Sequence, residues 1–498
     1  MLSTVVFLPL LAALGLIAAP RVPDVVSRWT FVAITAADLV LLVALWIGYD
    51  GGLAYRTDVE WVPSIGIGYR VGVDGLSLPL IALTAGLFLA CAIYSLRETR
   101  RVRSYVALFL FLETACLGLF AALDLIVFFL FFDLSIVGMY FVIAGWGHRG
   151  AARAALQFFL YTFVGSLALL LGFIGLYLAA SPRTFDIVAL TAQQPLAGRA
   201  TYGGLVLLAI FIGLAIKTPT VPFHTWLPPA HTEAPAAGSA ILAGVLLKMG
   251  TYGFVRIAMP LLPAEWRRYA LVIVVIGVIS VLYGALIALA QTNFKRMIAY
   301  TSVNHMGYVL LAVGAAGFVA SSDDQARQLA VTGAVTQMVS HGLITGALFL
   351  LTGVLYDRGQ SYEIAEYGGL AGPAPRFAAL ATVAAFASLG LPGFSGFIAE
   401  FQVFTGSLGA QPVATAIAVL GILITAALFL LAIQQMLLGP LRIPTGPGAT
   451  RLFPDMRAHE LASVVPLLLL AVAIGLAPRF LLDVIEPGSR TVVELVAR

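Results

Sequence analysis

The sequence predicts an all-α polytopic membrane protein with about 14 transmembrane helices. Hydrophobic residues make up 61% of the 498-residue chain and charged residues only 10%, whereas a typical soluble domain has about 25% charged residues. Most apolar runs reach about 20 residues, the length that spans the hydrocarbon as a helix. Because these runs are continuous and do not alternate with polar residues, they exclude a transmembrane β-barrel.

The expected helices follow one another without an intervening soluble domain, so we expect a single membrane domain over residues 1–498. Hydropathy and turn signals place the starts of the helices near Leu2, Trp29, Ser77, Tyr105, Leu125, Ala155, Tyr202, Glu233, Tyr269, Met297, Leu329, Phe377, Pro412 and Leu461. The longest connections, residues 50–75 and 181–201, are expected to be loops.

The distribution of Lys and Arg predicts the orientation. Arg100, Arg101 and Arg103 precede the fourth helix, whereas only Arg183 and Arg199 lie in the connection before the seventh. Because positively charged connections stay in the cytoplasm, the odd-numbered connections should be cytoplasmic and both termini should face outward. The net charge of +4 is spread over loops, and no basic block indicates a nucleic-acid partner.

Two of the expected helices are interrupted beside a charged residue. The seventh breaks at Pro219 and Pro222, directly after Lys217, and the twelfth breaks in Leu391-Pro-Gly-Phe-Ser-Gly396, shortly before Glu400. Broken helices are tolerated at membrane depth where the interior is polar or wet. A simple packing kink is the alternative, since proline is frequent in membrane helices.

The positions of the two breaks predict internal symmetry. They lie five helices apart, so the interrupted helices cross the membrane in opposite directions. This is the pattern of an inverted five-helix repeat, with a first copy over residues 105–260 and a second over residues 269–440.

Ionisable residues inside the predicted helices are the candidate functional groups, because each is costly there unless it faces partners or water. They are Glu113, Asp133, Lys217, His224, Lys248, His305, His341 and Glu400. Burial favours the uncharged form of a side chain and a nearby opposite charge favours the charged form, so a Lys–carboxylate pair can act as a proton switch. Lys217 with Asp133 is the candidate pair. Histidines exchange protons near neutral pH, so a proton relay is the leading interpretation.

Structural explanations remain open for these residues. Static ion pairs could account for the lysines and glutamates, and hydrogen bonds between helices could account for the histidines. Asp124 is close to Asp133 and could mark the helix end, and His224 could only cap its break. Arg256 is expected to extend its charged end toward the interface. No role is assigned to the histidines expected in loops, which are His148, His231 and His459.

The sequence carries no signature of a cofactor or metal site. Cys91 and Cys116 lie in apolar runs without other ligand residues. No P-loop, dinucleotide fingerprint, catalytic triad or metal-ligand spacing occurs. Any redox cofactor should therefore belong to another chain. The Asp74-Gly75 pair is expected to open the third helix, with Ser77 as its N-cap.

Several longer motifs extend over nearly the whole chain. They are Gly72-Val-Asp-Gly-Leu-Ser-Leu-Pro79, Lys217-Thr-Pro-Thr-Val-Pro-Phe-His-Thr-Trp-Leu-Pro228, His231-Thr-Glu-Ala-Pro235, Lys248-Met-Gly-Thr-Tyr-Gly253, Phe294-Lys-Arg-Met-Ile-Ala-Tyr-Thr-Ser-Val-Asn-His-Met-Gly307 and Leu391-Pro-Gly-Phe-Ser-Gly-Phe-Ile-Ala-Glu-Phe401. Together they resemble the antiporter-like proton-pumping membrane subunits of respiratory complex I, the NADH–quinone oxidoreductase, and most closely its subunit M branch.

The resemblance implies a role for each motif residue. Lys217 resembles the pump lysine and Lys248 the central relay lysine, with the relay histidines between them and the exit. Glu400 resembles the acidic exit residue of the subunit M branch, where subunit N and Mrp-type antiporter chains typically carry lysine. One position departs from the family, whose fifth helix normally has glutamate and proline where this chain has Asp133 and Gly138. The shorter aspartate leaves its contact with Lys217 open, and Glu113 could share its role.

The resemblance also implies the setting of the chain. It implies a multi-pass subunit of the bacterial plasma membrane that moves protons outward while other subunits transfer electrons from NADH to quinone. NADH, FMN, iron–sulfur clusters and quinone would then be bound by partner chains. Expected partners are the adjacent L-type and N-type antiporter-like subunits, the lateral helix of the L type, and membrane lipids. An Mrp-type sodium/proton antiporter chain, the membrane arm of a hydrogenase- or ferredoxin-linked complex, and a purely structural scaffold are the alternatives.

Overall fold

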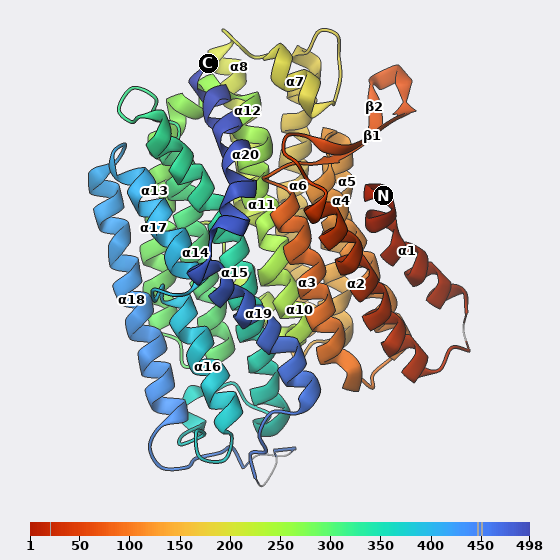
Figure 1. Ribbon diagram of the computed structural model, residues 1–498, viewed down its shortest axis with the longest axis vertical. Coiled ribbons are helices and arrows are strands. Elements are labelled where there is room, and N and C mark those ends of the chain that lie inside the picture. The colour runs from red at the N-terminus through yellow and green to blue at the C-terminus, as the bar shows by residue number, and fades with distance from the viewer. Residues whose placement is uncertain (20, 446–447, 450–451) are drawn as a thin grey trace.

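Long apolar helices dominate the computed structural model, which describes residues 1–19, 21–445, 448–449 and 452–498 (Figure 1). The first half contains α1 (Leu2–Ala18), α2 (Asp24–Ile47), β1 (Ala54–Val62), β2 (Ile67–Val73), α3 (Leu78–Tyr94), α4 (Val102–Ala121), α5 (Leu125–Trp146), α6 (Ala151–Ala179), α7 (Ile187–Gln193), α8 (Ala200–Lys217) and α9 (Leu227–Glu233). The second half contains α10 (Ala236–Ile241), α11 (Leu247–Gly253), α12 (Met259–Leu261), α13 (Pro263–Leu289), α14 (Phe294–Ala315), α15 (Asp324–Gly359), α16 (Pro375–Ser388), α17 (Ser395–Leu408), α18 (Pro412–Leu437), α19 (Ala458–Leu476) and α20 (Arg479–Ala497).

The predicted fold class is confirmed. Within the described residues, 11 helices are long and apolar enough to cross a membrane, counting the continuous α10–α12 segment as one. The shorter α1, the more polar α14 and the pair α16–α17 complete the set of helices that the sequence predicts. α14 is less apolar because it carries Lys295, Arg296, Asn304 and His305.

Both predicted helix breaks are present. α8 ends at Lys217, and the chain resumes helical structure only at Leu227, where α9 begins. α16 ends at Ser388 and α17 begins at Ser395. Between them Gly390 and Gly393 have φ angles of +77° and +99°, a backbone region that glycine enters without steric cost.

The central element is α15, whose apolar part is covered on all sides by other helices. Its 36 residues give it a length of roughly 54 Å, and it packs against α14, α17, α19 and α20. Near its start, Arg327 donates hydrogen bonds to the carbonyls of Ala316 and Val493 at 3.0 and 3.1 Å. Near its end, Arg358 forms a bidentate pair with Glu460 of α19, with N···O distances of 2.6 and 2.7 Å.

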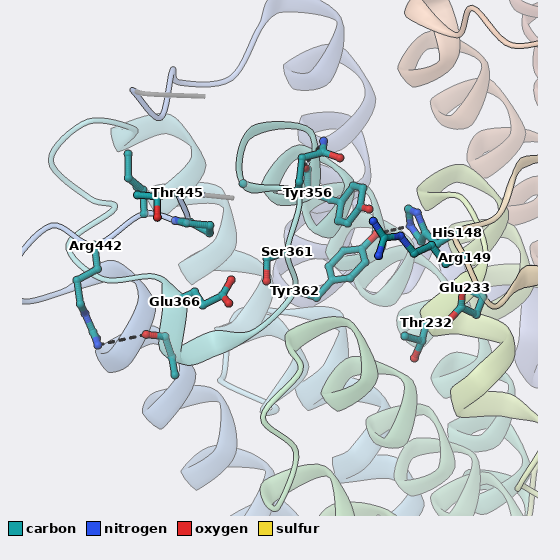
Figure 2. A pocket seen from close by; sticks show the side chains of 15 residues that line it. His148, Arg149, Thr232, Glu233, Tyr356, Ser361, Tyr362, Glu366, Arg442 and Thr445 are labelled. Carbon is teal, nitrogen blue, oxygen red and sulfur yellow. Dashed lines mark hydrogen bonds between the residues drawn. The ribbon is translucent and has the colours of Figure 1, made fainter. Parts of the chain in front are cut away.

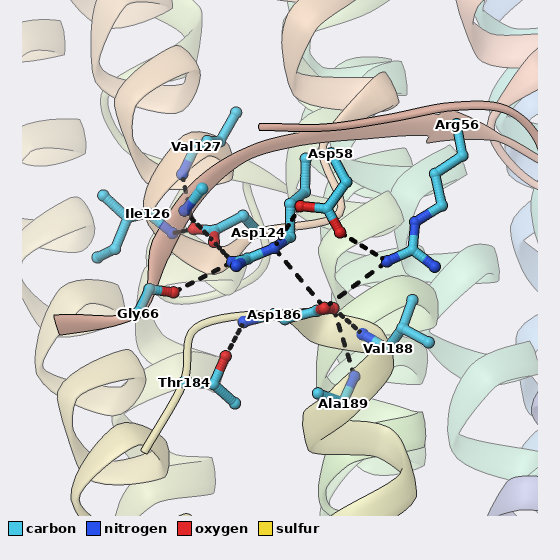
Figure 3. Close-up of polar contacts among 12 residues, drawn as sticks. Arg56, Asp58, Gly66, Asp124, Ile126, Val127, Thr184, Asp186, Val188 and Ala189 are labelled. Atoms are coloured by element: carbon cyan, nitrogen blue, oxygen red, sulfur yellow. Dashed lines mark hydrogen bonds and ion pairs between the residues drawn. The ribbon is translucent and has the colours of Figure 1, made fainter. Parts of the chain in front are cut away.

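A two-stranded antiparallel hairpin, β1–β2, occupies part of the segment that was expected to be only a loop. A charged cluster fixes it to the ends of two helices (Figure 3). Arg70 on β2 contacts Asp124 at 2.7 Å and Asp58 at 3.0 Å, and Arg56 reaches Asp186 at 3.9 Å. Asp124 also caps α5 by accepting the backbone N–H of Ile126, so it marks the helix start, as the sequence analysis considered.

The sequence analysis did not predict α20. This helix is amphipathic, and its buried positions form one stripe: Leu481, Ile485, Ser489, Val492, Val493 and Val496. α20 packs against α13 and α15. Both chain ends lie toward the hairpin end of the bundle (Figure 1), where Tyr69 of β2 donates to Ser3 at 3.1 Å and Arg498 lines the same cavity as Tyr49.

The Arg358–Glu460 pair should contribute strongly to stability, because both side chains are almost completely buried. Replacing Glu460→Gln removes the negative charge from this buried bidentate pair, so the free energy of unfolding should fall by about 3–5 kcal/mol. A thermal unfolding scan of the purified protein in detergent checks this. Glu60→Gln, on the exposed strand β1, is the matched control and should leave the midpoint unchanged. Equal midpoints for the two variants would contradict the prediction.

Candidate functional site

Lys217 lies at the last position of α8, where its side chain is fully buried. Its amine donates a hydrogen bond to the Ser135 hydroxyl of α5 at 3.1 Å. It also lies 4.8 Å from the centre of the Phe132 ring and 5.9 Å from that of Phe158, distances at which an aromatic face attracts a cation. The lysine at the break is therefore held by a hydroxyl and two rings.

Asp133, the candidate partner of Lys217 whose contact was left open from the sequence, makes no direct ion pair with it. The two charges are close enough to interact, but no ion pair of 4.0 Å or less joins these two described residues. Phe132 and Ser135 lie one helical turn apart and share the face toward α8, whereas Asp133 is turned by about 100° from Phe132. One Asp133 oxygen is buried without a hydrogen-bond partner among the described residues.

Lys248 lies between two stretches of π-helix, Leu242–Leu246 and Phe254–Ala258, within the continuous α10–α12 segment. Such stretches are rare and frequently mark functional sites. The fully buried Lys248 amine donates to the carbonyl of Ala243 at 2.5 Å and lies 2.6 Å from His341 Nδ1 of α15. Its partners are thus a carbonyl and an imidazole.

The two candidate histidines, His341 and His305, lie side by side. The ring centres of His341 and His305 are 5.3 Å apart and the rings are perpendicular. If His341 Nδ1 accepts a hydrogen bond from Lys248, the neutral ring carries its proton on Nε2. His341 Nε2 and His305 Nε2 are both buried without a hydrogen-bond partner in the described part of the chain. The structure therefore brings Lys248, His341 and His305 together as a contiguous group.

Glu400 lies in the second turn of α17, directly after the second break, and is 5% exposed. It makes no hydrogen bond or ion pair with any described residue. A Cβ atom at Gly390 would collide with its carboxylate, so the glycine at the break makes room for it. Tyr308 of α14 lies between the histidines and this carboxylate: its ring centre is 6.1 Å from that of His305, and its hydroxyl is within electrostatic range of Glu400.

Two predicted residues lie apart from this group. His224, in the break between α8 and α9, packs against Tyr283 with ring centres 5.0 Å apart and, within the described residues, makes no hydrogen bond with either lysine. Glu113 of α4 is fully buried and has no hydrogen-bond partner for either oxygen among the described residues. Its electrostatic neighbour is Asp38 of α2, which is equally buried and unpaired.

Buried groups that were not singled out from the sequence include Asp38 and His231. Asp38 is a lone acid in an apolar helix, so the criterion that selected Glu113 would also have selected it. His231 was expected in a loop because prolines surround it, but it belongs to α9 and is completely buried. Its ring stacks on Phe349 of α15 with centres 4.5 Å apart, and neither ring nitrogen has a hydrogen-bond partner in the described residues.

Arg256 was expected to reach the interface, but it forms an ion pair with Asp74 at 2.5 Å. Asp74 in turn caps α3, because its carboxylate accepts the N–H groups of Leu76 and Ser77. Ser77 occupies the N-cap position without making a side-chain cap. Burial opposes the charged form of Asp74, but Arg256 and the two N–H groups together hold the pKa of its carboxyl below its usual range.

The candidate lysines differ from the static ion pairs of the same bundle. Arg358 and Glu460 satisfy each other in a bidentate geometry, whereas no carboxylate of the described residues lies within 4.0 Å of the Lys217 or Lys248 amine. Their partners Ser135 and His341 can each both accept and donate a hydrogen bond. A lysine with such partners can gain or lose its proton more easily than a cation that is held by a bidentate carboxylate.

The sequence was compared with protein families and curated proteins. A family model described as "NADH:quinone oxidoreductase/Mrp antiporter, TM" matches residues 122–425. The NADH-quinone oxidoreductase subunit M of Rickettsia bellii (strain RML369-C) is 39% identical over 495 residues, which cover 97% of this chain and 96% of the relative.

The fold was compared with solved structures. A chain of the respiratory complex I from Thermus thermophilus with bound NADH superposes with a TM-score of 0.88 at 30% identity, over the whole of both chains. A chain of the Mrp complex from Dietzia sp. DQ12-45-1b gives a TM-score of 0.87 at 23% identity, over 100% of this chain and 99% of that one. The second likeness concerns the fold alone.

Close packing at a glycine holds the two lysine-bearing helices together. A Cβ atom at Gly250, two residues after Lys248, would lie 2.6 Å from the Leu214 carbonyl and 2.8 Å from the Thr218 amide. Gly250→Ala should therefore separate α8 from α11 and lower the free energy of unfolding by about 1–3 kcal/mol. Thermal unfolding checks this against Gly86→Ala on α3, where a Cβ atom meets nothing within 4 Å. Unchanged stability of Gly250→Ala would show that this contact is not tight.

Proposed function

Because the chain belongs to the subunit M family of NADH-quinone oxidoreductase, an antiporter-like proton-translocating subunit of complex I, we propose that its buried lysines, histidines and Glu400 carry protons across the membrane. We call Lys217, Lys248, His341, His305 and Glu400 the relay row. The observation that carries the proposal is the contiguous group of Lys248, His341 and His305 inside the bundle. It joins the region of the first helix break to that of the second.

The chemistry of each step follows from the residue types. A buried amine without a carboxylate partner releases its proton more readily than an exposed one, and His341 Nδ1 is in place to accept it from Lys248 at 2.6 Å. A neutral imidazole takes up a proton at one nitrogen and releases one at the other. His305 then passes the proton toward Glu400, with Tyr308 between them. The carboxylate releases it at the far side.

Lys217 is the proposed switch at the other end of the row. Its charge interacts with Asp133 without a direct ion pair. A separated pair of this kind can be closed or opened by a small movement of either side chain, and its state changes the charge next to the Lys248 helix. Electron transfer in neighbouring subunits would act on this pair through its electric field.

The redox chemistry is assigned to partner subunits. NADH, FMN, iron–sulfur clusters and quinone would be bound there, and no group of His, Cys, Asp or Glu suited to a metal occurs in the described part of this chain. The partners we propose are the neighbouring L-type and N-type subunits, the lateral helix of the L type, and lipids around the apolar outer helices.

The orientation and the internal repeat are part of the same proposal. Both termini would face outward from the plasma membrane, which agrees with their common position at the hairpin end of the bundle (Figure 1). Residues 105–260 and 269–440 would be the two inverted repeats. The two helix breaks support this assignment, since one falls in each proposed repeat.

An Mrp-type antiporter remains the second candidate on fold alone, because the Dietzia chain has nearly the same TM-score. The identity of 39% to a subunit M favours complex I, and so does the acidic Glu400. Sodium-dependent proton exchange in vesicles without NADH would favour the antiporter instead.

Removal of either end of the relay row should stop proton transfer. Lys217→Ala or Glu400→Gln should lower NADH-driven proton pumping by roughly 10²-fold or more, the range of a proton-transferring side chain. The measurement is the initial rate of acidification of inverted membrane vesicles, with assembly of the complex checked on native gels. Full pumping by assembled mutant complexes would refute the relay row.

The two candidate switch carboxylates can be ranked. Asp133→Asn should reduce pumping more than Glu113→Gln, because Asp133 is within electrostatic range of Lys217 whereas the neighbours of Glu113 are Asp38 and the buried cysteines. The same vesicle assay compares them, and each variant keeps the size of the side chain it replaces. The reverse order would assign the switch to Glu113.

A further inference from the structure

A polar cavity of about 800 Å³ opens at one end of the bundle, where the odd-numbered connections lie. His148, from the turn between α5 and α6, meets Tyr362, from the segment after α15, on one side of it (Figure 2). Glu233, the last residue of α9, also lines this wall. The relay row uses none of these three residues.

Behind this wall a hydrogen-bonded path leads inward. His148 Nε2 lies 3.0 Å from the Tyr362 hydroxyl, and the same hydroxyl lies 3.3 Å from the amine of Lys295. Lys295, at the start of α14, is completely buried. Its amine also donates to the carbonyl of Ala234 at 2.5 Å, and no carboxylate of the described residues pairs with it within 4.0 Å. Tyr362 therefore joins a residue of the cavity wall to a buried amine.

His231 continues the path toward the centre. It is completely buried, and both of its ring nitrogens are without a hydrogen-bond partner among the described residues. Both the Lys295 and the Lys248 amine are within electrostatic range of this ring. An imidazole with two open nitrogens can accept a proton on one side and release a proton on the other.

We propose that the cavity beside His148 and Tyr362 is the entrance of a proton-uptake path that runs through Lys295 and His231 to Lys248. The inference rests on the proposed function, because it supplies protons to the relay row. It adds four residues to that row, all from elements that meet only in the folded chain.

The proton balance of the path is closed. The neutral Lys295 amine accepts the hydroxyl proton of Tyr362. The Tyr362 oxygen accepts the proton on His148 Nε2 at the same time. The other ring nitrogen of His148 accepts a proton from water in the cavity. Lys295 then gives a proton to one nitrogen of His231, and the other nitrogen releases one to Lys248. One proton moves inward, and Tyr362 ends unchanged.

The state of His148 suits this role. Burial, followed by the charges of Lys295 and Arg100, lowers the pKa of His148 to about 4. The ring is therefore neutral near pH 7, with one nitrogen that donates and one that accepts. A permanently charged histidine would have no acceptor and would block transfer toward a lysine.

A structural role for Lys295 is the alternative, since its amine could simply hold the end of α9 through Ala234. The two roles predict different results for Lys295→Arg. An arginine keeps the positive charge and the donor groups but does not lose its proton in proteins. A structural role tolerates this exchange, whereas a proton path does not.

The test compares Lys295→Arg and Tyr362→Phe with Tyr356→Phe in the whole complex in inverted membrane vesicles. Tyr356 is the matched control, because its ring stacks on Tyr362 with centres 4.7 Å apart but its hydroxyl is outside the path. Both path variants should lower NADH-driven proton pumping on the order of 10²-fold, while NADH oxidation by a water-soluble acceptor is kept. Tyr356→Phe should pump as the unmodified complex does.

Each outcome of this test either supports or contradicts the proposed uptake path. Normal pumping by assembled Lys295→Arg and Tyr362→Phe complexes would overturn the uptake path. If Lys295→Arg fails to assemble, Tyr362→Phe decides alone, since it removes only one oxygen atom. Lys248→Ala is measured in parallel. Normal pumping by Lys248→Ala would refute the relay row itself. Loss of pumping by Lys248→Ala together with normal pumping by Tyr362→Phe would refute only the entrance.

Discussion

A buried ammonium group needs hydrogen-bond acceptors around it. The acceptors that this chain supplies to Lys248 are the interaction on which the arrangement of the bundle interior depends. Burying such a charge without partners is costly, and a carboxylate at contact distance would hold it permanently. The chain instead offers the carbonyl of Ala243 from a π-helical stretch and the imidazole of His341 from α15. Neither partner carries a negative charge, so the amine is stabilised in the bundle without a fixed counter-charge.

Other features of the bundle depend on this arrangement. The histidine partner comes from α15, the central helix, whose apolar length is covered by other helices. Direct ion pairs with carboxylates are found outside the proposed relay row. Arg358 pairs with Glu460 at one end of α15, and Arg256 pairs with Asp74 at the start of α3. Glycines at Gly250 and Gly390 allow backbone or carboxylate groups to approach without a side chain between them.

Much of this could be predicted from the sequence, because hydropathy and proline act locally. Pro219 and Pro222 located the first helix break directly after Lys217, where α8 ends, and the charges in apolar runs selected the residues that we propose for the relay. Whether Asp133 touches Lys217 could not be predicted, because one residue's difference along a helix turns a side chain by about 100°, which spacing alone does not resolve. The π-helical stretches, the β-hairpin and the amphipathic α20 left no hydropathy signal. The neighbourhood of His148, Tyr362 and Lys295 arises from segments more than 60 positions apart, so no local pattern contains it.

The fastening of α15 at both ends has a mechanical consequence. Arg327 ties its beginning to Ala316 and to Val493 of α20, and Arg358 ties its end to α19. These contacts oppose a sliding of α15 along its own axis relative to α19 and α20. The proposed relay row needs no such sliding, since each of its transfers would require only the rotation of single side chains.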